Sequence, residues 1–170
     1  MMPSLGGCFV RFCLVSALGW VFLGSPPLFA QTPQVQVNLV AKRVTVDQGK
    51  EVLVLADKAK PGDVIQYEAL YRNTGATPVR QVGAVVPIPT GLALIESTTS
   101  PEAVEASLDG KTFRSIPLTR PVPNEAGVME DQPVPLAKYR ALRWNLPEVP
   151  AGGSVTVTLR ARVTTNGPPR

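Results

Sequence analysis

The sequence predicts an all-β protein, an antiparallel β-sandwich of seven or eight strands. Apolar and polar side chains alternate in several short segments, a pattern typical of strands with one buried face. Turn-forming residues separate these segments at short intervals, since 18 of the 170 residues are proline and 14 are glycine. No segment has the periodicity of a convincing amphipathic helix. Many short strands with regular turns favour a sandwich.

The first expected strands lie between residues 35 and 73. Residues 35–39 alternate, and residues 51–56 form a second short apolar run. The turn at 59–63 contains a proline and a glycine, which supply the backbone angles that a tight turn needs. A longer strand is then expected over 64–73. Its predicted inward side chains are Ile65, Tyr67, Ala69 and Tyr71.

The middle of the chain contains shorter elements. Residues 80–86 read as extended, but Pro87 and Pro89 cannot donate to a ladder. Residues 87–91 should therefore leave the sheet or lie on an edge, and residues 92–98 can re-enter as a short strand.

A proline-rich region follows at 104–135. Asp109 and Gly110 predict a hairpin turn that joins residues 104–108 to 112–116. Five prolines fall between 117 and 135, so this segment is expected to be a long, mobile surface loop. Long loops on rigid scaffolds often have a function, although a tolerated insertion explains the composition equally well.

The last two expected strands are the clearest. In residues 139–146, Leu142, Trp144 and Leu146 lie on the same face of the expected strand. Residues 154–164 alternate strictly between apolar side chains, most of them β-branched, and polar ones. Trp144 could be a ligand platform, but its spacing favours a place in the core.

The first thirty residues have the pattern of a secretory signal peptide. Residues 12–23 are an apolar run without charge, preceded by Arg11 and followed by helix-breaking residues before Ala30. Cleavage is expected after Ala30, which leaves residues 31–170 as a single domain. An uncleaved anchor is the alternative, but the run is shorter than the ~20 residues of a membrane span. Cys8 and Cys13 would leave with the leader.

The composition excludes several kinds of chemistry. The chain has no histidine, so it cannot form a Ser-His-Asp or Cys-His site or a histidine-ligated metal centre. After cleavage it would also lack cysteine. The net charge of +4 is modest and its lysines and arginines are scattered, so nucleic acid is not an expected partner. We assign no catalytic, cofactor-binding or metal-binding residue, and we expect no cofactor.

The remaining candidates for chemistry are weak. Aspartates near turns usually bind their own backbone, and these lack the spacing of a calcium loop. Arginines on strands 139–146 and 154–164 would form a basic strip only if those strands paired. A serine–lysine hydrolase remains formally open, and the few aromatics disfavour sugar binding. The residues concerned are Asp57, Asp63 and Asp109; Arg140, Arg143, Arg160 and Arg162; Ser97, Ser107 and Ser115 with Lys58, Lys60, Lys111 and Lys138; and Tyr67, Tyr71, Phe113, Tyr139 and Trp144.

Four turn motifs occur in an order that resembles a known family. They are residues 60–67 (KPGDVIQY), 71–75 (YRNTG), 87–92 (PIPTGL) and 146–157 (LPEVPAGGSVTV). Together they resemble the bacterial conserved-repeat domain called domain of unknown function number eleven, over roughly residues 35–165. The resemblance implies an immunoglobulin-type sandwich in a secreted, surface or outer-membrane protein. Val86 stands where the family often has an aspartate, and this chain holds a single copy.

These observations lead to an expected function. We expect an exported, non-enzymatic structural or protein-interaction module of the bacterial cell envelope, located in the periplasm, at the outer membrane or outside the cell. Partners would bind at an edge strand or at loop 117–135. No integral membrane span is expected after cleavage. The alternatives are an accessory domain that binds glycan or calcium and a hydrolase that works without histidine.

Overall fold

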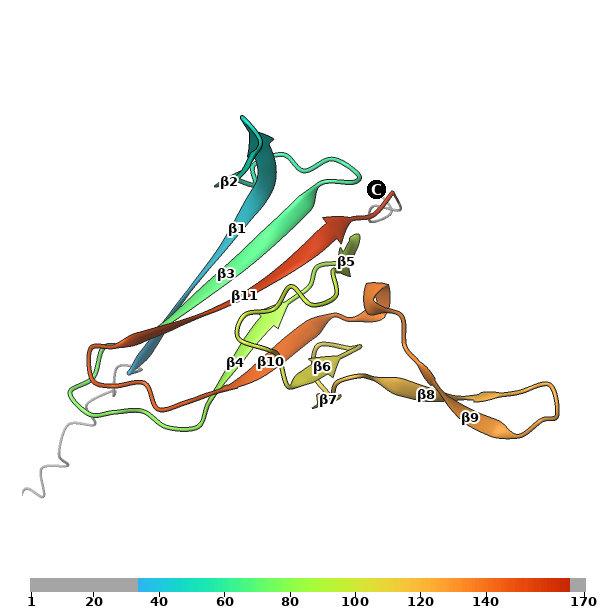
Figure 1. Ribbon diagram of the computed structural model, residues 1–170. Coiled ribbons are helices and arrows are strands. Elements are labelled where there is room, and N and C mark those ends of the chain that lie inside the picture. Colours follow the sequence, from blue (N-terminus) through green and yellow to red (C-terminus); the bar gives the residue numbers. More distant parts are fainter. Residues whose placement is uncertain (1–33, 166–170) are drawn as a thin grey trace, which may run out of the picture. The chain divides into compact units, whose positions relative to one another are not determined.

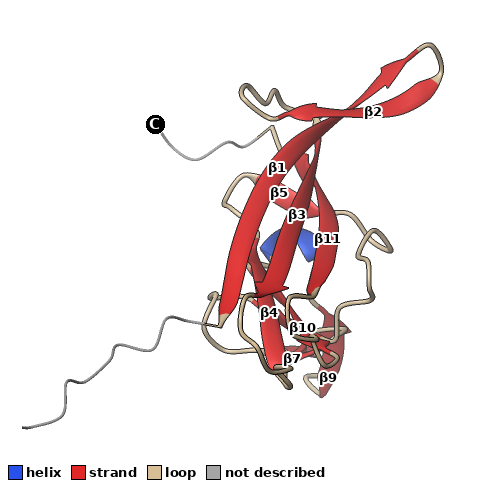
Figure 2. Ribbon diagram, turned by 90° about the vertical axis from the view of Figure 1, so that its left-hand side faces the viewer, coloured by secondary structure: helices blue, strands red, loops and turns tan. Residues whose placement is uncertain are grey.

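Residues 34–165 are described by the computed structural model, so the expected leader at 1–30 lies outside the described residues. The described part consists of eleven β-strands and one short 3₁₀ turn, η1 (Leu136–Lys138), and it contains no α-helix (Figure 2). All strand pairs in its three sheets are antiparallel. The predicted all-β class and antiparallel pairing are therefore confirmed.

The larger sheet has five strands (Figure 1). Its two longest predicted strands pair directly, and their alternation places one face of each in the core. The first strand is longer than the expected 35–39 because Gln48 and Gly49, both with positive φ, turn it into a hairpin with the next strand. The strands, in order across the sheet, are β2 (Lys50–Leu55), β1 (Val35–Asp47), β3 (Val64–Asn73), β11 (Ser154–Val163) and β5 (Leu92–Leu94).

The second sheet has four strands. The hairpin predicted around Asp109 and Gly110 is present, since β6 pairs with β7 on either side of it. The expectation that residues 87–91 leave the sheet or lie at an edge is also confirmed, because β4 is an edge strand that ends at Pro87. The strands, in order, are β4 (Val82–Pro87), β10 (Ala141–Leu146), β6 (Glu105–Ser107) and β7 (Arg114–Ser115).

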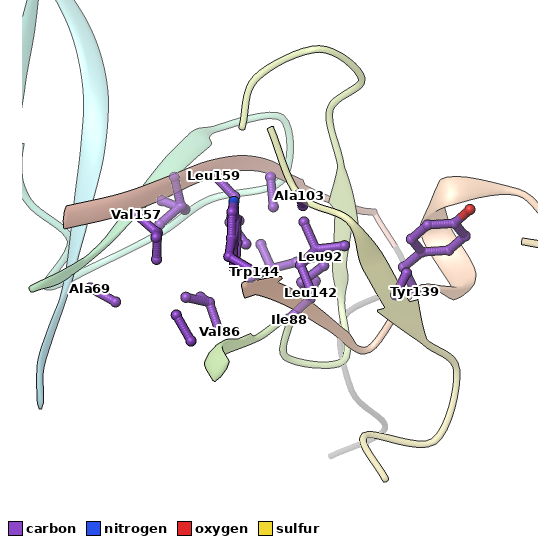
Figure 3. Packing of buried hydrophobic residues seen from close by; sticks show 14 of the residues in the cluster. Ala69, Val86, Ile88, Leu92, Ala103, Tyr139, Leu142, Trp144, Val157 and Leu159 are labelled. Atoms are coloured by element: carbon purple, nitrogen blue, oxygen red, sulfur yellow. The ribbon is translucent and has the colours of Figure 1, made fainter. Parts of the chain in front are cut away.

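One hydrophobic core receives side chains from both sheets (Figure 3). Trp144 is 1% exposed, and its indole N–H donates to the carbonyl of Pro101 at 2.7 Å. The core position expected for Trp144 is therefore confirmed. The predicted inward faces of β3 and β11 hold too, because Ile65, Ala69 and Leu159 are all buried.

The segment 117–135 is not the expected loop. Its residues form a separate two-stranded sheet from β8 (Thr119–Pro123) and β9 (Met129–Pro133), which extends away from the larger sheets (Figure 1). The prolines tolerate this pairing because they occupy positions whose N–H groups are not used between the two strands. The number of strands among residues 34–165 therefore exceeds the expected seven or eight.

Candidate functional site

Two of the three turn aspartates, Asp63 and Asp109, accept hydrogen bonds from their own turns, as the sequence predicted. Asp109 accepts hydrogen bonds from the backbone N–H groups of Thr112 at 2.7 Å and Lys111 at 2.8 Å, and also from the hydroxyl of Ser107. These bonds, led by the one from Thr112, lower the pKa of the Asp109 carboxyl well below its usual range. Asp63 likewise accepts the N–H of Lys60. Within residues 34–165, no group of three acidic or other metal-ligating side chains is placed to hold a metal ion.

The serines and lysines considered as a catalytic pair have other contacts in the described part of the chain. Ser107 is fully buried, and its hydroxyl donates to Asp109 at 2.8 Å. No hydrogen bond joins a serine hydroxyl to a lysine amine between residues 34 and 165. Ser107 therefore stabilises the β6–β7 turn.

The basic strip does not form, because β10 and β11 belong to different sheets. Arg143 pairs with Glu105 and lies over the ring of Phe113, 4.5 Å from its centroid. Arg160 donates to Gln66 at 2.8 Å and reaches both carboxylate oxygens of Glu51, on β2, at 3.0 and 3.2 Å. Each of these two arginines therefore neutralises a carboxylate within its own sheet.

The aromatic side chains do not provide an exposed sugar platform. Tyr71, Tyr139 and Trp144 are at most 5% exposed, and the phenol of Tyr139 accepts the N–H of Leu118 at 3.0 Å. Tyr67 is half-buried, and burial raises the pKa of its hydroxyl. The aromatic rings of the described residues thus serve mainly the core.

A cavity of about 470 Å³ opens near β5 and η1. Its walls are mixed: Leu94, Ile116 and Leu142 are apolar, whereas the carboxylates of Glu96 and Glu102 also line it. The cavity combines apolar surface with negative charge, but no cation-holding cluster converges there among residues 34–165. The residues that line the cavity therefore do not identify a class of ligand.

What remains is the set of strand edges, where unpaired backbone groups can bind another strand. The free edges of the two main sheets belong to β2 and β5 in one sheet and to β4 and β7 in the other. β5 has three residues and β7 has two, and such short edges offer little to pair with. The longer edge strands of the two main sheets, β2 and β4, are therefore the candidates for strand addition.

The edge of β4 is closed by a side chain. Ile88 donates its N–H to the carbonyl of Arg140. The backbone N–H and C=O groups of even-numbered residues of β4 therefore point toward β10, and those of odd-numbered residues point outward. The hydroxyl of Tyr71 accepts the outward N–H of Val85 at 2.9 Å and donates to its carbonyl at 3.1 Å. Pro87, the next outward residue, has no N–H. Tyr71 therefore occupies the place of a neighbouring strand.

The β8 edge of the β8–β9 hairpin is protected by prolines, whereas β9 keeps the outward N–H groups of Met129 and Asp131. Val134 donates its N–H to the carbonyl of Leu118, so even-numbered residues of β8 bond to β9. Pro121 and Pro123 are odd-numbered, and they stand where an N–H would otherwise face outward from β8. Proline at such positions blocks strand addition. A partner of this hairpin would have to contact side chains instead of pairing with the backbone of β8.

The edge of β2 has neither device. Ala56 donates its N–H to the carbonyl of Ala41. The backbone groups of even-numbered residues of β2 therefore point toward β1, and those of Glu51, Leu53 and Leu55 point outward. The strand contains no proline, and no side chain hydrogen-bonds to its outward groups in the described part of the chain. It is also apolar on both faces, with Val52, Leu53, Val54 and Leu55 between 36% and 67% exposed.

Sequence reasoning found β2 as a short strand but not as a binding edge. The available signal was its four consecutive apolar residues, 52–55, because an uninterrupted apolar run is typical of a strand covered on both faces. The structure leaves both faces of this run exposed. No sequence pattern predicted that the hydroxyl of Tyr71 would cap the edge of β4.

Comparison with known proteins adds no relative, since no family model, no curated protein and no solved structure matches this chain. In residues 34–165, none of the elements is a helix of the length and apolarity required to cross a bilayer.

Proposed function

We propose that this chain is an exported, non-enzymatic interaction module of the bacterial cell envelope that binds a partner by strand addition at β2. The observation behind this proposal is the contrast between the edges. β4 is capped at Val85, the β8 side of the hairpin is blocked by prolines, β9 keeps two outward N–H groups, and β5 and β7 are very short, whereas β2 keeps three unguarded outward positions. Soluble proteins normally protect such an edge, so its exposure favours a binding role.

The envelope location rests on the sequence. The signal-like segment at 1–30 favours export, and the four turn motifs resemble a family of secreted and surface domains. The arrangement of two antiparallel sheets around one core is compatible with the immunoglobulin-type sandwich that the resemblance implies. Chemistry that depends on histidine is excluded by the composition. These points favour a protein that acts through its surface.

The β8–β9 hairpin is the second candidate contact. Its tip exposes Val128 and Met129, each at 59%, while Asn124 accepts the N–H of Val128 at 3.0 Å and shapes the turn. An isolated two-stranded hairpin is marginally stable in water. An apolar tip on such a hairpin fits a side-chain contact with a partner, which would also stabilise it.

Export and partner binding are tested separately. Mass spectrometry of the protein from its host should find an N-terminus near Gln31; an intact Met1 on a cytosolic species would contradict export. Amide hydrogen exchange is then compared between the purified protein, diluted until sedimentation shows a monomer, and the protein in its envelope fraction. We expect the peptide over 50–57 to exchange more slowly in the envelope. Unchanged exchange both there and over 119–133 would refute an interaction module.

A further inference from the structure

We infer that the partner of β2 is the β2 strand of a second copy, paired antiparallel about a two-fold axis at Leu53. This inference rests on the proposed function, because it assumes that the β2 edge binds a strand. It goes further by naming the occupant and the register. The pairing would join two five-stranded sheets into one continuous sheet.

The backbone limits the possible registers. Only the backbone N–H and C=O groups of Glu51, Leu53 and Leu55 point outward from β2. In an antiparallel pair, two directly opposed residues either both point their backbone groups toward each other or both point them away. A two-fold pairing must therefore match odd-numbered residues with odd-numbered ones. Among the registers that meet this condition, those centred on Val52, Leu53 or Val54 pair most of the strand.

Charge and turn geometry separate these three registers. Centring on Val54 places Glu51 opposite the partner's Asp57 and Lys50 opposite the partner's Lys58, and directly opposed like charges are destabilising. Centring on Val52 places Leu55 opposite the partner's Gly49, which lies in the hairpin turn with φ +78°. Centring on Leu53 avoids both problems and lets every outward group of the strand pair.

The side chains are self-complementary in this register. The sequence Val52-Leu53-Val54 is the same in both directions, so each Val52 faces the partner's Val54 on one side of the sheet, and the two Leu53 side chains meet on the other. Leu55 faces the partner's Glu51, whose charge is already neutralised by Arg160. The pairing thus covers apolar surface that is now exposed and brings no uncompensated charge onto it.

A single cysteine tests the register. In the full chain with Cys8 and Cys13 replaced by serine, Leu53→Cys should form a disulfide-linked dimer on mild oxidation, because opposed Cα atoms in such a pair lie about 5.5 Å apart. Leu70→Cys is the matched control. Leu70 lies on the same face of the sheet and is 36% exposed against 37% for Leu53, but its strand, β3, is paired on both sides. We expect Leu70→Cys to stay monomeric.

A charge tests the association itself. Leu53→Lys keeps every backbone bond to β1 and places two like charges on the two-fold axis. Sedimentation of the otherwise unchanged chain should show a concentration-dependent dimer that this variant weakens at least tenfold, with an unchanged far-ultraviolet spectrum. Leu70→Lys should leave the dimer intact.

The outcomes separate the inference from the proposed function. Equal cross-linking at 53 and 70, or at neither, overturns self-pairing, as does a dimer that survives Leu53→Lys. If self-pairing fails while the 50–57 peptide is still protected in the envelope, β2 binds a different protein and the proposed function stands. If that protection is also absent, and 119–133 is unprotected as well, both fail.

Discussion

Removing the side chain of Asn73 should destabilise the fold more than its single amide suggests. Asn73 is fully buried at the end of β3. Its Nδ2 donates to the carbonyls of Thr77, Val149 and Pro150 at 2.8, 3.0 and 3.1 Å, and its Oδ1 accepts the N–H of Gly75 at 2.9 Å. One side chain thus joins the turn after β3 to the turn before β11, although the two are far apart in the sequence.

The structure sets the size of the effect. In Asn73 the two hydrogens of Nδ2 are shared among three carbonyls and Oδ1 accepts one N–H, so Asn73→Ala removes about three full hydrogen bonds of about 1 kcal/mol net each and leaves buried partners without a bond. We expect a loss of about 3–4 kcal/mol in the free energy of unfolding. With an unfolding entropy of about 2.1 cal/mol/K per residue, this loss lowers Tm by about 10–14 °C. Asn73→Asp should cost more at pH 7, since it aims a negative oxygen at three carbonyl oxygens.

The assay is urea and thermal unfolding followed by circular dichroism. Asn145→Ala is the control, because Asn145 is an exposed asparagine on β10. It should change the free energy of unfolding by less than about 0.5 kcal/mol. A Tm for Asn73→Ala within about 2 °C of the unaltered chain, or equal to that of the control, would show that these hydrogen bonds do not stabilise the fold.

Three further predictions concern other parts of the fold. The hydrogen bonds that Asp109 accepts, first of all from the N–H of Thr112, lower the pKa of its carboxyl. The carboxylate therefore stabilises the fold above about pH 4, and this contribution fades as the pH falls. Asp109→Asn should flatten the dependence of the urea midpoint on pH between about 5 and 2. Tyr71→Phe frees the outward backbone groups of Val85, and we expect a loss of about 1–2 kcal/mol in urea unfolding and faster amide exchange at Val85; exchange at the unaltered rate would argue against the cap. Trp144→Ala empties the centre of the core and should cost about 3–5 kcal/mol in the same assay, whereas a loss below about 1 kcal/mol would contradict its place there.

Features that depend on local order could be predicted from the sequence alone. Alternation identified β3 and β11 and assigned their inward faces, and it placed Trp144 in the core. These predictions held because the side-chain direction in a strand follows from the backbone alone, whichever strand lies beside it. The turn at Asp109 and Gly110 was likewise readable, since its residue types suit the backbone angles of a hairpin.

Which strands are neighbours and which edges stay free depends on long-range packing that the sequence pattern does not show. β10 and β11 follow each other in the chain but enter different sheets, so the basic strip was lost. The segment 117–135 became a hairpin because its prolines fall on positions that need no donor. Tyr71 closes one edge while β2 remains open. Alternation cannot fix such choices, because hydrogen bonds between strands are satisfied equally well by any partner in register, and packing of the whole core selects among them.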